Sequence, residues 1–292
     1  MHLCRFNNDR LGLVEGSVVF DVSEALRVLP VPTWPYPPGD PLILHLDEVR
    51  AAALQAKASA PRKPLDQVTL HSPITCPTKI MAAPANYRLH VEIDAQDPGV
   101  HHGKHHLEIA GVERPVEKFG LFLKANSAIV GPADGVALHW LDRRNDHEVE
   151  LSVVIGRKGK NIPAARALEY VAGYMVGLDI VVRGTEDRSY RKSADSYAVF
   201  GPWLTTADEI ADPQNLTFWL EVNGRPQQRS SSGAMTVKID ELIEIASRVY
   251  TLYPGDIIMT GSPEGVSALK PGDRLRAGCE KIGEMTLDVR AA

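Results

Sequence analysis

Short apolar runs, broken at close intervals by glycine and proline, constrain the fold of this chain more than any other feature. From Val68 onward the sequence contains GLFLKANSAIVG, VELSVVIG, LTFWLEVNG and GDIIMTGSP, which are rich in β-branched and aromatic residues. Few such runs are long enough for a helix, and Gly and Pro mark the turns between strands. The pattern favours a β-rich α+β fold over alternating β-α-β units.

The first part of the chain has a different texture and predicts a small N-terminal domain. The run RLGLVEGSVVFDV alternates apolar and polar residues around Glu15 and Gly16, which predicts a β-hairpin. A proline-dense stretch follows, and residues 46–61 have a helical composition that ends at Pro61. We expect a small N-terminal domain over residues 1–72 and a catalytic, metal-binding domain over residues 73–292.

Two segments of the second domain have helical patterns. In VKIDELIEIASRVY the apolar side chains recur at helical spacing, which predicts an amphipathic helix. The recurring positions are Ile239, Leu242, Ile243, Ala246 and Val249. ALEYVAG, residues 167–173, is a second and shorter candidate for a helix.

Charge and composition argue against several functional classes. The 292 residues carry a formal net charge of −5 and the basic residues are scattered, so we expect no nucleic-acid partner. No window has the apolar length needed to cross a bilayer and the first residues lack a leader pattern, so we expect no membrane partner and a cytoplasmic location. Three cysteines far apart in sequence argue against disulfides and against a paired-thiol metal site.

Two glutamates stand at the start of an apolar strand in NDHEVELSVVIG, residues 145–156. In a strand, residues two apart point to the same side, so the carboxylates of Glu148 and Glu150 share a face with their Cα atoms roughly 7 Å apart. One interpretation is a solvent-facing strand end. The other is a divalent cation held by both carboxylates, because buried like charges need a counter-charge to stay ionised.

Asp179 is the single acid in the apolar run YVAGYMVGLDIVVRG. A buried aspartate is rare without a partner, and a salt bridge to Arg183 or a strand bend after Gly177 would each account for it. It would also supply a third carboxylate beside Glu148 and Glu150. An all-oxygen site of this kind suits Mg²⁺, Mn²⁺ or Ca²⁺ rather than zinc.

Five blocks of the sequence resemble the fumarylacetoacetate hydrolase family, in its order and spacing. They are DHEVELSVVIGRKGKNIP, YVAGYMVGLDIVVRG, RKSADSYAVFGPWLTTADEI, VNG and YTLYPGDIIMTGSPEGV, and the similarity spans residue 79 to the C-terminus. The resemblance implies a mixed β-sandwich or roll behind a smaller N-terminal domain, and a homodimer. It assigns the divalent metal, Mg²⁺ or Mn²⁺ with Ca²⁺ as an alternative, to Glu148, Glu150 and Asp179.

The resemblance also assigns the active-site lysine to Lys192, whose alternative reading is a surface lysine in the charged loop DRSYRKSAD. A cation beside the metal stabilises an enolate or oxyanion as charge develops. By the same resemblance, substrate contacts are expected at Tyr87, Arg183, Thr260 and Gly261. The last two match the family loop TGTPxGV, although a plain turn would also explain them. The chain reads DIVVRG where many relatives read DVSARD, so it keeps Arg183 but loses a serine and an acid.

NYRLHVE resembles the family's lid motif NYxxHxxE and predicts a lid over residues 84–119. His90 matches the catalytic histidine, but Ile93 stands where the family has its glutamate. Glu92, Asp94 or a carboxylate from later in the lid is the substitute. A histidine base needs a partner to hold its tautomer. The stretch HHGKHHLE, residues 101–108, is interpreted as a solvated lid loop, with a soft-metal site as the alternative.

The implied activity is metal-dependent cleavage of a C–C bond in a small diketo or 2-oxo acid of the acylpyruvate type, as met in the breakdown of aromatic compounds. Hydration, decarboxylation, isomerisation and sugar-acid dehydration use the same enolate chemistry within the family, and they stay open. A noncatalytic metal-dependent binding protein is a further alternative, motivated by Ile93.

Overall fold

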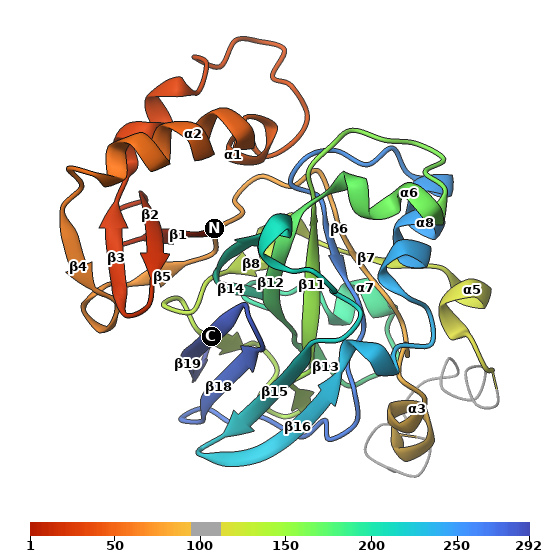
Figure 1. The fold of residues 1–292 in the computed structure, drawn as a ribbon. Helices are drawn as coiled ribbons and strands as arrows, with labels where there is room; N and C mark the ends of the chain where they lie inside the picture. The colour runs from red at the N-terminus through yellow and green to blue at the C-terminus, as the bar shows by residue number, and fades with distance from the viewer. Residues whose placement is uncertain (95–111) are drawn as a thin grey trace.

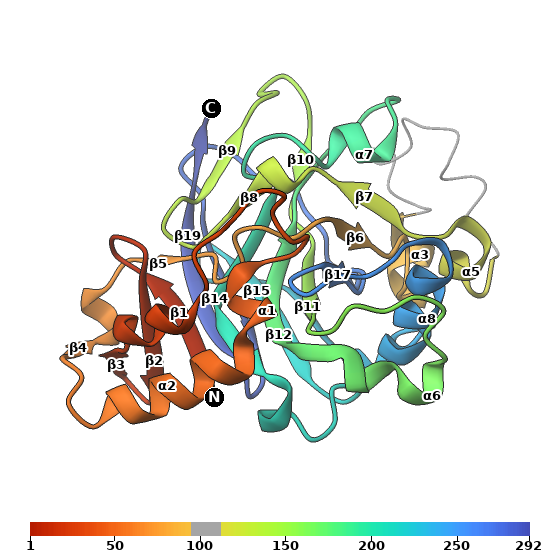
Figure 2. The same ribbon diagram turned by 90° about the horizontal axis from the view of Figure 1, so that it is seen from above.

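The computed structural model describes residues 1–94 and 112–292 and confirms the β-rich α+β fold (Figure 1). The stretch HHGKHHLE lies outside these residues. Strands form one large mixed sheet, one smaller sheet and a two-stranded ribbon, with short helices at the periphery (Figure 2). In the described ranges no helix is both long and apolar enough to span a bilayer.

The large sheet has twelve strands in the order β4-β3-β2-β1-β14-β12-β11-β17-β6-β7, with β5 paired to β1 and β8 to β14. The strands are β1 (His2–Phe6), β2 (Arg10–Glu15), β3 (Val18–Asp21), β4 (Arg62–Pro64), β5 (Leu70–His71), β6 (Ile80–Ala82), β7 (Phe122–Lys124), β8 (Ile129–Val130), β11 (Val149–Ile155), β12 (Val171–Asp179), β14 (Ala198–Thr206) and β17 (Ile257–Met259).

The smaller sheet has the order β16-β15-β18-β19-β9, and a separate ribbon joins β10 to β13. These strands are β9 (Val136–Leu138), β10 (Asn145–Asp146), β13 (Val181–Val182), β15 (Thr217–Val222), β16 (Arg225–Ser231), β18 (Arg274–Cys279) and β19 (Gly283–Ala291). Buried side chains of β11, β12, β15, β18 and β19 belong to one hydrophobic cluster, so the core lies between the two sheets.

The helical segments are short, apart from two. They are η1 (Ser23–Val28), α1 (Pro41–Leu44), α2 (Leu46–Lys57), η2 (Leu65–Gln67), α3 (Arg88–Asp94), α5 (Pro115–Phe119), η3 (Asn126–Ala128), α6 (Ala164–Ala167), η4 (Leu168–Tyr170), α7 (Arg188–Arg191), η5 (Ala207–Glu209), η6 (Ser232–Ala234) and α8 (Ile239–Val249). α3 and α5 lie at the same end of the molecule (Figure 1).

The N-terminal segment folds as its sequence predicts, with a β2–β3 hairpin that turns at Gly16 and a helix α2 beside it. Its strands continue the large sheet, because β1 pairs with β14 of the second part of the chain. The division into domains at residues 72 and 73 stays a prediction.

One helix prediction is confirmed and the other needs correction. Helix α8 forms and buries Ile239 and Leu242, whereas Val249, its last residue, is 67% exposed. ALEYVAG does not continue as a helix. After the single 3₁₀ turn η4, Val171 begins β12, where pairing with β11 and β14 outweighs local helical composition.

Candidate metal centre and active site

The three predicted acids meet because of the register between β11 and β12. Glu150 lies opposite Gly177 in this antiparallel pair, and the amide of Asp179 donates to the carbonyl of Glu148 at 2.8 Å. All three side chains are buried, and one oxygen from each lies within 4.8 Å of the others. Val149, between the two glutamates, and Leu151, which follows Glu150, point to the opposite face, into the core between the sheets.

Basic side chains surround two of the three acids. Lys192 is the C-cap of α7, and its Nζ donates to Glu148 Oε2 at 2.6 Å and to Asp179 Oδ2 at 2.5 Å. Arg183 Nη2 lies 3.5 Å from Glu148 Oε1. Lys192 is therefore a buried member of the acid cluster, and the alternative of a surface lysine does not fit this geometry.

Glu150 differs from the other two acids in its surroundings. Burial, and then the negative charge of Asp179, raise the pKa of Glu150 well above its usual range, against the opposing charge of Lys192. For Glu148, burial acts in the same direction, but Lys192 and Arg183 outweigh it and lower the pKa to about 2. Keeping Glu150 ionised here requires a further positive charge, and three clustered carboxylates are the ligands that hard divalent cations prefer. The residues fit the implied metal.

Lys124 also belongs to this acid cluster, and we did not predict it from the sequence. It is the last residue of β7, is fully buried, and its Nζ donates to Asp179 Oδ1 and to the carbonyl of Lys192. Burial lowers the pKa of Lys124, and the charge of Asp179 opposes this. The signal was a lone lysine closing the apolar run GLFLK, where a buried lysine needs an acidic partner.

The loop after β17 contacts Glu150 directly. The amide of Gly261 donates to Glu150 Oε2 at 2.7 Å, and the hydroxyl of Thr260 donates to the carbonyl of Leu151 at 2.9 Å. Gly261 has a φ of +97°, and a Cβ there would lie 2.7 Å from the Cβ of Asn86, so glycine is required twice over. The structure thus brings both predicted loop residues to the metal centre. The Gly261 amide and the Thr260 hydroxyl each donate to an acceptor within the protein.

The base of the lid is fixed to that loop. Asn86 is buried, and its amide donates to the carbonyls of Thr260 and Val237 at 2.8 and 2.9 Å. Tyr87 packs edge-on to Phe218, and its buried hydroxyl has no hydrogen-bond partner in the described part of the chain. This hydroxyl is a polar group that a ligand oxygen can satisfy.

The structure brings His90 to the centre but not Glu92. His90 is buried on α3 and contributes to lowering the pKa of Glu148, after Lys192 and Arg183 and against the effect of burial. Glu92 is exposed and pairs with Arg88 at 3.0 Å. Two residues along a helix correspond to a rotation of about 200°, so Glu92 faces away from His90. The side chain of Asp94 is outside the described part of the structure.

Arg183 takes part in a buried salt bridge with Asp146 of β10, two residues before Glu148. Its Nε donates to Asp146 Oδ2 at 2.7 Å, and Arg144 Nε donates to the other oxygen at 2.7 Å. In the described part of the chain the ion pairs of Arg183 include those to Asp146 and Glu148. Asp179 is held by lysines.

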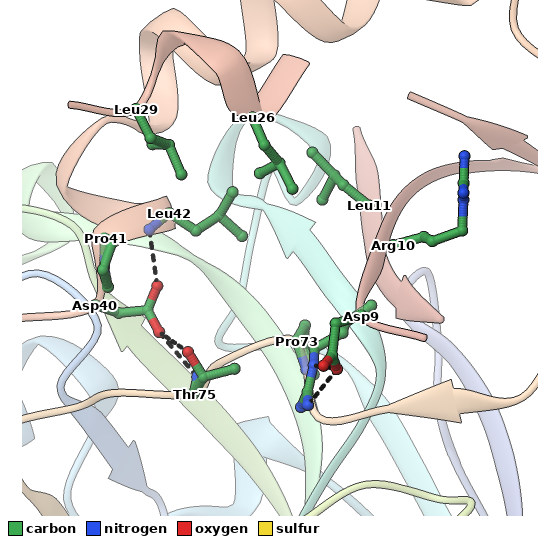
Figure 3. A pocket seen from close by; sticks show the side chains of 11 residues that line it. Asp9, Arg10, Leu11, Leu26, Leu29, Asp40, Pro41, Leu42, Pro73 and Thr75 are labelled. Carbon is green, nitrogen blue, oxygen red and sulfur yellow. Dashed lines mark hydrogen bonds and ion pairs between the residues drawn. The ribbon is translucent and has the colours of Figure 1, made fainter. Parts of the chain in front are cut away.

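A cavity of about 300 Å³ lies elsewhere, in the N-terminal part of the molecule (Figure 3). Its walls include four leucines, and its polar groups pair within the protein. Asp40 accepts hydrogen bonds from the amides of Leu42 and Thr75, and Arg5 forms an ion pair with Asp9. No predicted site residue lines this cavity, so it is separate from the acid cluster.

Comparison with known proteins identifies the family of the chain. The family described as fumarylacetoacetate (FAA) hydrolase, C-terminal, matches residues 79–290. The chain is 48% identical over 291 residues to maleylpyruvate hydrolase of Aquipseudomonas alcaligenes, with both chains covered in full. It is 37% identical to the mitochondrial oxaloacetate tautomerase of Rattus norvegicus over 238 residues, which is 77% of this chain and 71% of that protein.

Among solved structures, maleylpyruvate hydrolase from Sphingobium sp. SYK-6 superposes with a TM-score of 0.82 at 36% identity, over the full length of both chains. A second structure of that enzyme, at 35% identity and the same TM-score, is a complex with manganese(II) and pyruvate. The sequence motifs and these matches agree, and the chain belongs to the fumarylacetoacetate hydrolase family.

Proposed function

We propose that this chain is a divalent-metal-dependent hydrolase that cleaves an acylpyruvate to pyruvate and a carboxylic acid. The observation that carries the proposal is the buried cluster of Glu148, Glu150 and Asp179 with Lys192 at its edge. Similarity over the full length to a maleylpyruvate hydrolase makes maleylpyruvate the first substrate to test. Aromatic-ring breakdown supplies acids of this kind.

Glu148, Glu150 and Asp179 would hold the metal. When bound, the cation supplies Lewis-acid polarisation of the substrate's carboxylate and keto oxygens. The manganese complex of the Sphingobium relative favours Mn²⁺ as the first ion to test, with Mg²⁺ and Ca²⁺ as alternatives for an all-oxygen site.

Lys192 would stabilise the negative charge that leaves with the pyruvate half. Hydrolysis adds water across the bond between the acyl carbonyl carbon and the methylene carbon. The bonding pair then passes to the methylene carbon as an enolate, which takes up a proton to give pyruvate. An ammonium group held within 2.6 Å of Glu148 and Asp179 cannot drift with solvent, so its charge is fixed in place before the reaction starts.

His90 would take the proton from the attacking water. It stands on α3 at the base of the lid, is buried, and is near enough to Glu148 to influence its pKa, although burial and the charges of Lys192 and Arg183 count for more. Arg183 and the Tyr87 hydroxyl are proposed contacts for the substrate's outer oxygens. Thr260 and Gly261 are proposed to face its carboxylate, while Gly261 also orients Glu150.

Replacing His90 by alanine is expected to lower kcat by about 10²- to 10⁴-fold, the usual contribution of a general base. The Mn²⁺ dissociation constant should stay within a factor of about three, because His90 is outside the ligand set. Steady-state kinetics and calorimetric titration with Mn²⁺ measure the two quantities. Weaker Mn²⁺ binding in His90→Ala would contradict the assignment of His90 as a base.

Glu92→Gln is the matched variant on the same helix. Because Glu92 pairs with Arg88 on the solvent side of α3, kcat should remain within about threefold of wild type. A loss as large as that of His90→Ala would instead make Glu92 the partner of His90.

Product analysis tests the reaction itself. With Mn²⁺ and maleylpyruvate, we expect one equivalent each of pyruvate and maleate, followed by mass spectrometry, and no turnover after chelation by EDTA. Carbon dioxide release would indicate a decarboxylase. Conversion without any gain of water would indicate an isomerase or tautomerase, the activity named for the rat relative. Homodimeric assembly is proposed from the family resemblance, and a cytoplasmic location stays an expectation from the sequence.

A further inference from the structure

Gln228 is the one fully buried residue of the otherwise solvated strand β16. Its side chain points into the protein toward β11 and is only 1% exposed. A buried amide has four hydrogen-bonding positions, and leaving them unmade is costly. Neither the metal ligands nor the proposed catalytic residues account for a glutamine at this position.

The partners of Gln228 fix which way its amide points. Its Oε1 accepts from the amide of Val149 at 3.0 Å, and its Nε2 donates to the carbonyl of Pro263 at 2.8 Å. Nε2 also lies 2.8 Å from Ser262 Oγ. One partner is a backbone donor and another a backbone acceptor, so the reversed amide would face both with the wrong group. Val149 stands between Glu148 and Glu150, whereas Ser262 and Pro263 follow Gly261.

His147 makes a second link of the same kind. Its Nδ1 lies 2.9 Å from Gln228 Oε1, and because that oxygen is an acceptor, Nδ1 must carry the proton. Its Nε2 lies 2.8 Å from Ser267 Oγ, and its amide donates to the carbonyl of Ser267 at 3.3 Å. The segment just before β11 is thus hydrogen-bonded to Ser267, at the far end of the same loop.

The loop rests directly on β16. Gly265 has a φ of +92°, and a Cβ there would lie 2.0 Å from the carbonyl oxygen of Gln227. No side chain fits between the two backbones, so the loop and the strand are in contact at this point. Gln228 follows Gln227 at this contact, and its side chain hydrogen-bonds to Val149 of β11.

We propose that Gln228 is a positioning residue that clamps loop 260–267 onto β11, which bears Glu150 and directly follows Glu148. The clamp sets where Thr260 and Gly261 stand relative to the metal ligands. It thereby sets the fit of the substrate carboxylate, a part of the inference that rests on the proposed hydrolase function. His147 supports the clamp by donating to the same oxygen of Gln228.

Hydrogen exchange measures the clamp without reference to activity. Gln228→Glu keeps an oxygen for Val149 and His147 but faces the Pro263 carbonyl with a second acceptor, so the loop side alone is broken. Amides within residues 260–267 should exchange on the order of 10-fold faster than in wild type, the equivalent of one lost buried hydrogen bond. Arg229→Gln, an exposed change on the same strand, should leave these rates unaltered. Unchanged exchange in Gln228→Glu overturns the proposal.

Kinetics separates positioning from a merely structural role. In Gln228→Glu we expect KM for maleylpyruvate to rise by roughly 10-fold to 100-fold, with kcat within about fivefold of wild type. A loss of folded protein would lower kcat and leave KM unchanged, which would contradict a positioning role.

His147→Asn, which keeps a donor near the Nδ1 position, should retain a lower KM than His147→Leu. If wild-type protein hydrolyses no acylpyruvate, the proposed function fails, and the exchange rates still decide on the clamp.

Discussion

Asp179→Asn is expected to abolish Mn²⁺ binding and hydrolysis together. The substitution removes one of three clustered carboxylates, and even residues outside a metal's ligand set change affinity by 10- to 100-fold. We expect the Mn²⁺ dissociation constant to rise by more than about 100-fold. Turnover should fall by about a thousandfold or more, because Lewis-acid assistance contributes several kcal/mol. Calorimetric titration with Mn²⁺ and product release measure the two effects.

Glu150→Gln guards against the possibility that Asp179→Asn fails to fold, since Asp179 also pairs with Lys124 and Lys192. Glu150 has no ion pair in the described part of the chain, so its loss removes a ligand without leaving a buried lysine alone. The two variants should agree. Asp195→Asn, an exposed change near Lys192, should bind Mn²⁺ as wild type does. Full activity in either ligand variant would refute the assignment.

Lys192→Met is expected to separate metal binding from catalysis. Losing one preorganised donor at the site of developing charge lowers kcat by about 10²- to 10³-fold. The Mn²⁺ affinity should be equal to or higher than that of wild type, because a positive charge beside Glu148 and Asp179 is removed. The comparison is made in saturating Mn²⁺, so that the two acids keep a counter-charge.

Lys158→Met, on the protein surface, is the control for removal of a lysine as such and should be fully active. If Lys192→Met retains wild-type kcat, the ammonium has no part in the chemical step. If it loses Mn²⁺ affinity, Lys192 acts in building the centre rather than in catalysis.

Much of the centre was predictable because strands have a fixed period. Glu148 and Glu150 had to share a face, and an aspartate at the end of the following buried strand could pair with them in an antiparallel register. Burial explains why Asp179 could not stand alone. The hairpin at Gly16 and helix α8 followed from equally local rules.

The rest depended on contacts between residues far apart in sequence. Lys124 reaches Asp179 from β7, and Gln228 reaches Val149 from β16. Nothing near either residue indicates that partner. Glu92 shows the reverse case: it is the acid nearest to His90 in sequence, but helical rotation turns it to solvent. Val249 keeps the helical spacing but is the last residue of α8 and is exposed.

The most direct measurement is an anomalous-scattering map from crystals soaked in Mn²⁺. The three-acid centre predicts a strong peak bounded by carboxylate oxygens of Glu148, Glu150 and Asp179, at distances of about 2.0–2.6 Å typical of hard cations. A map in which Mn²⁺ binds only elsewhere, with Glu148 and Asp179 still held by Lys192, would contradict the centre and the chemistry proposed for it.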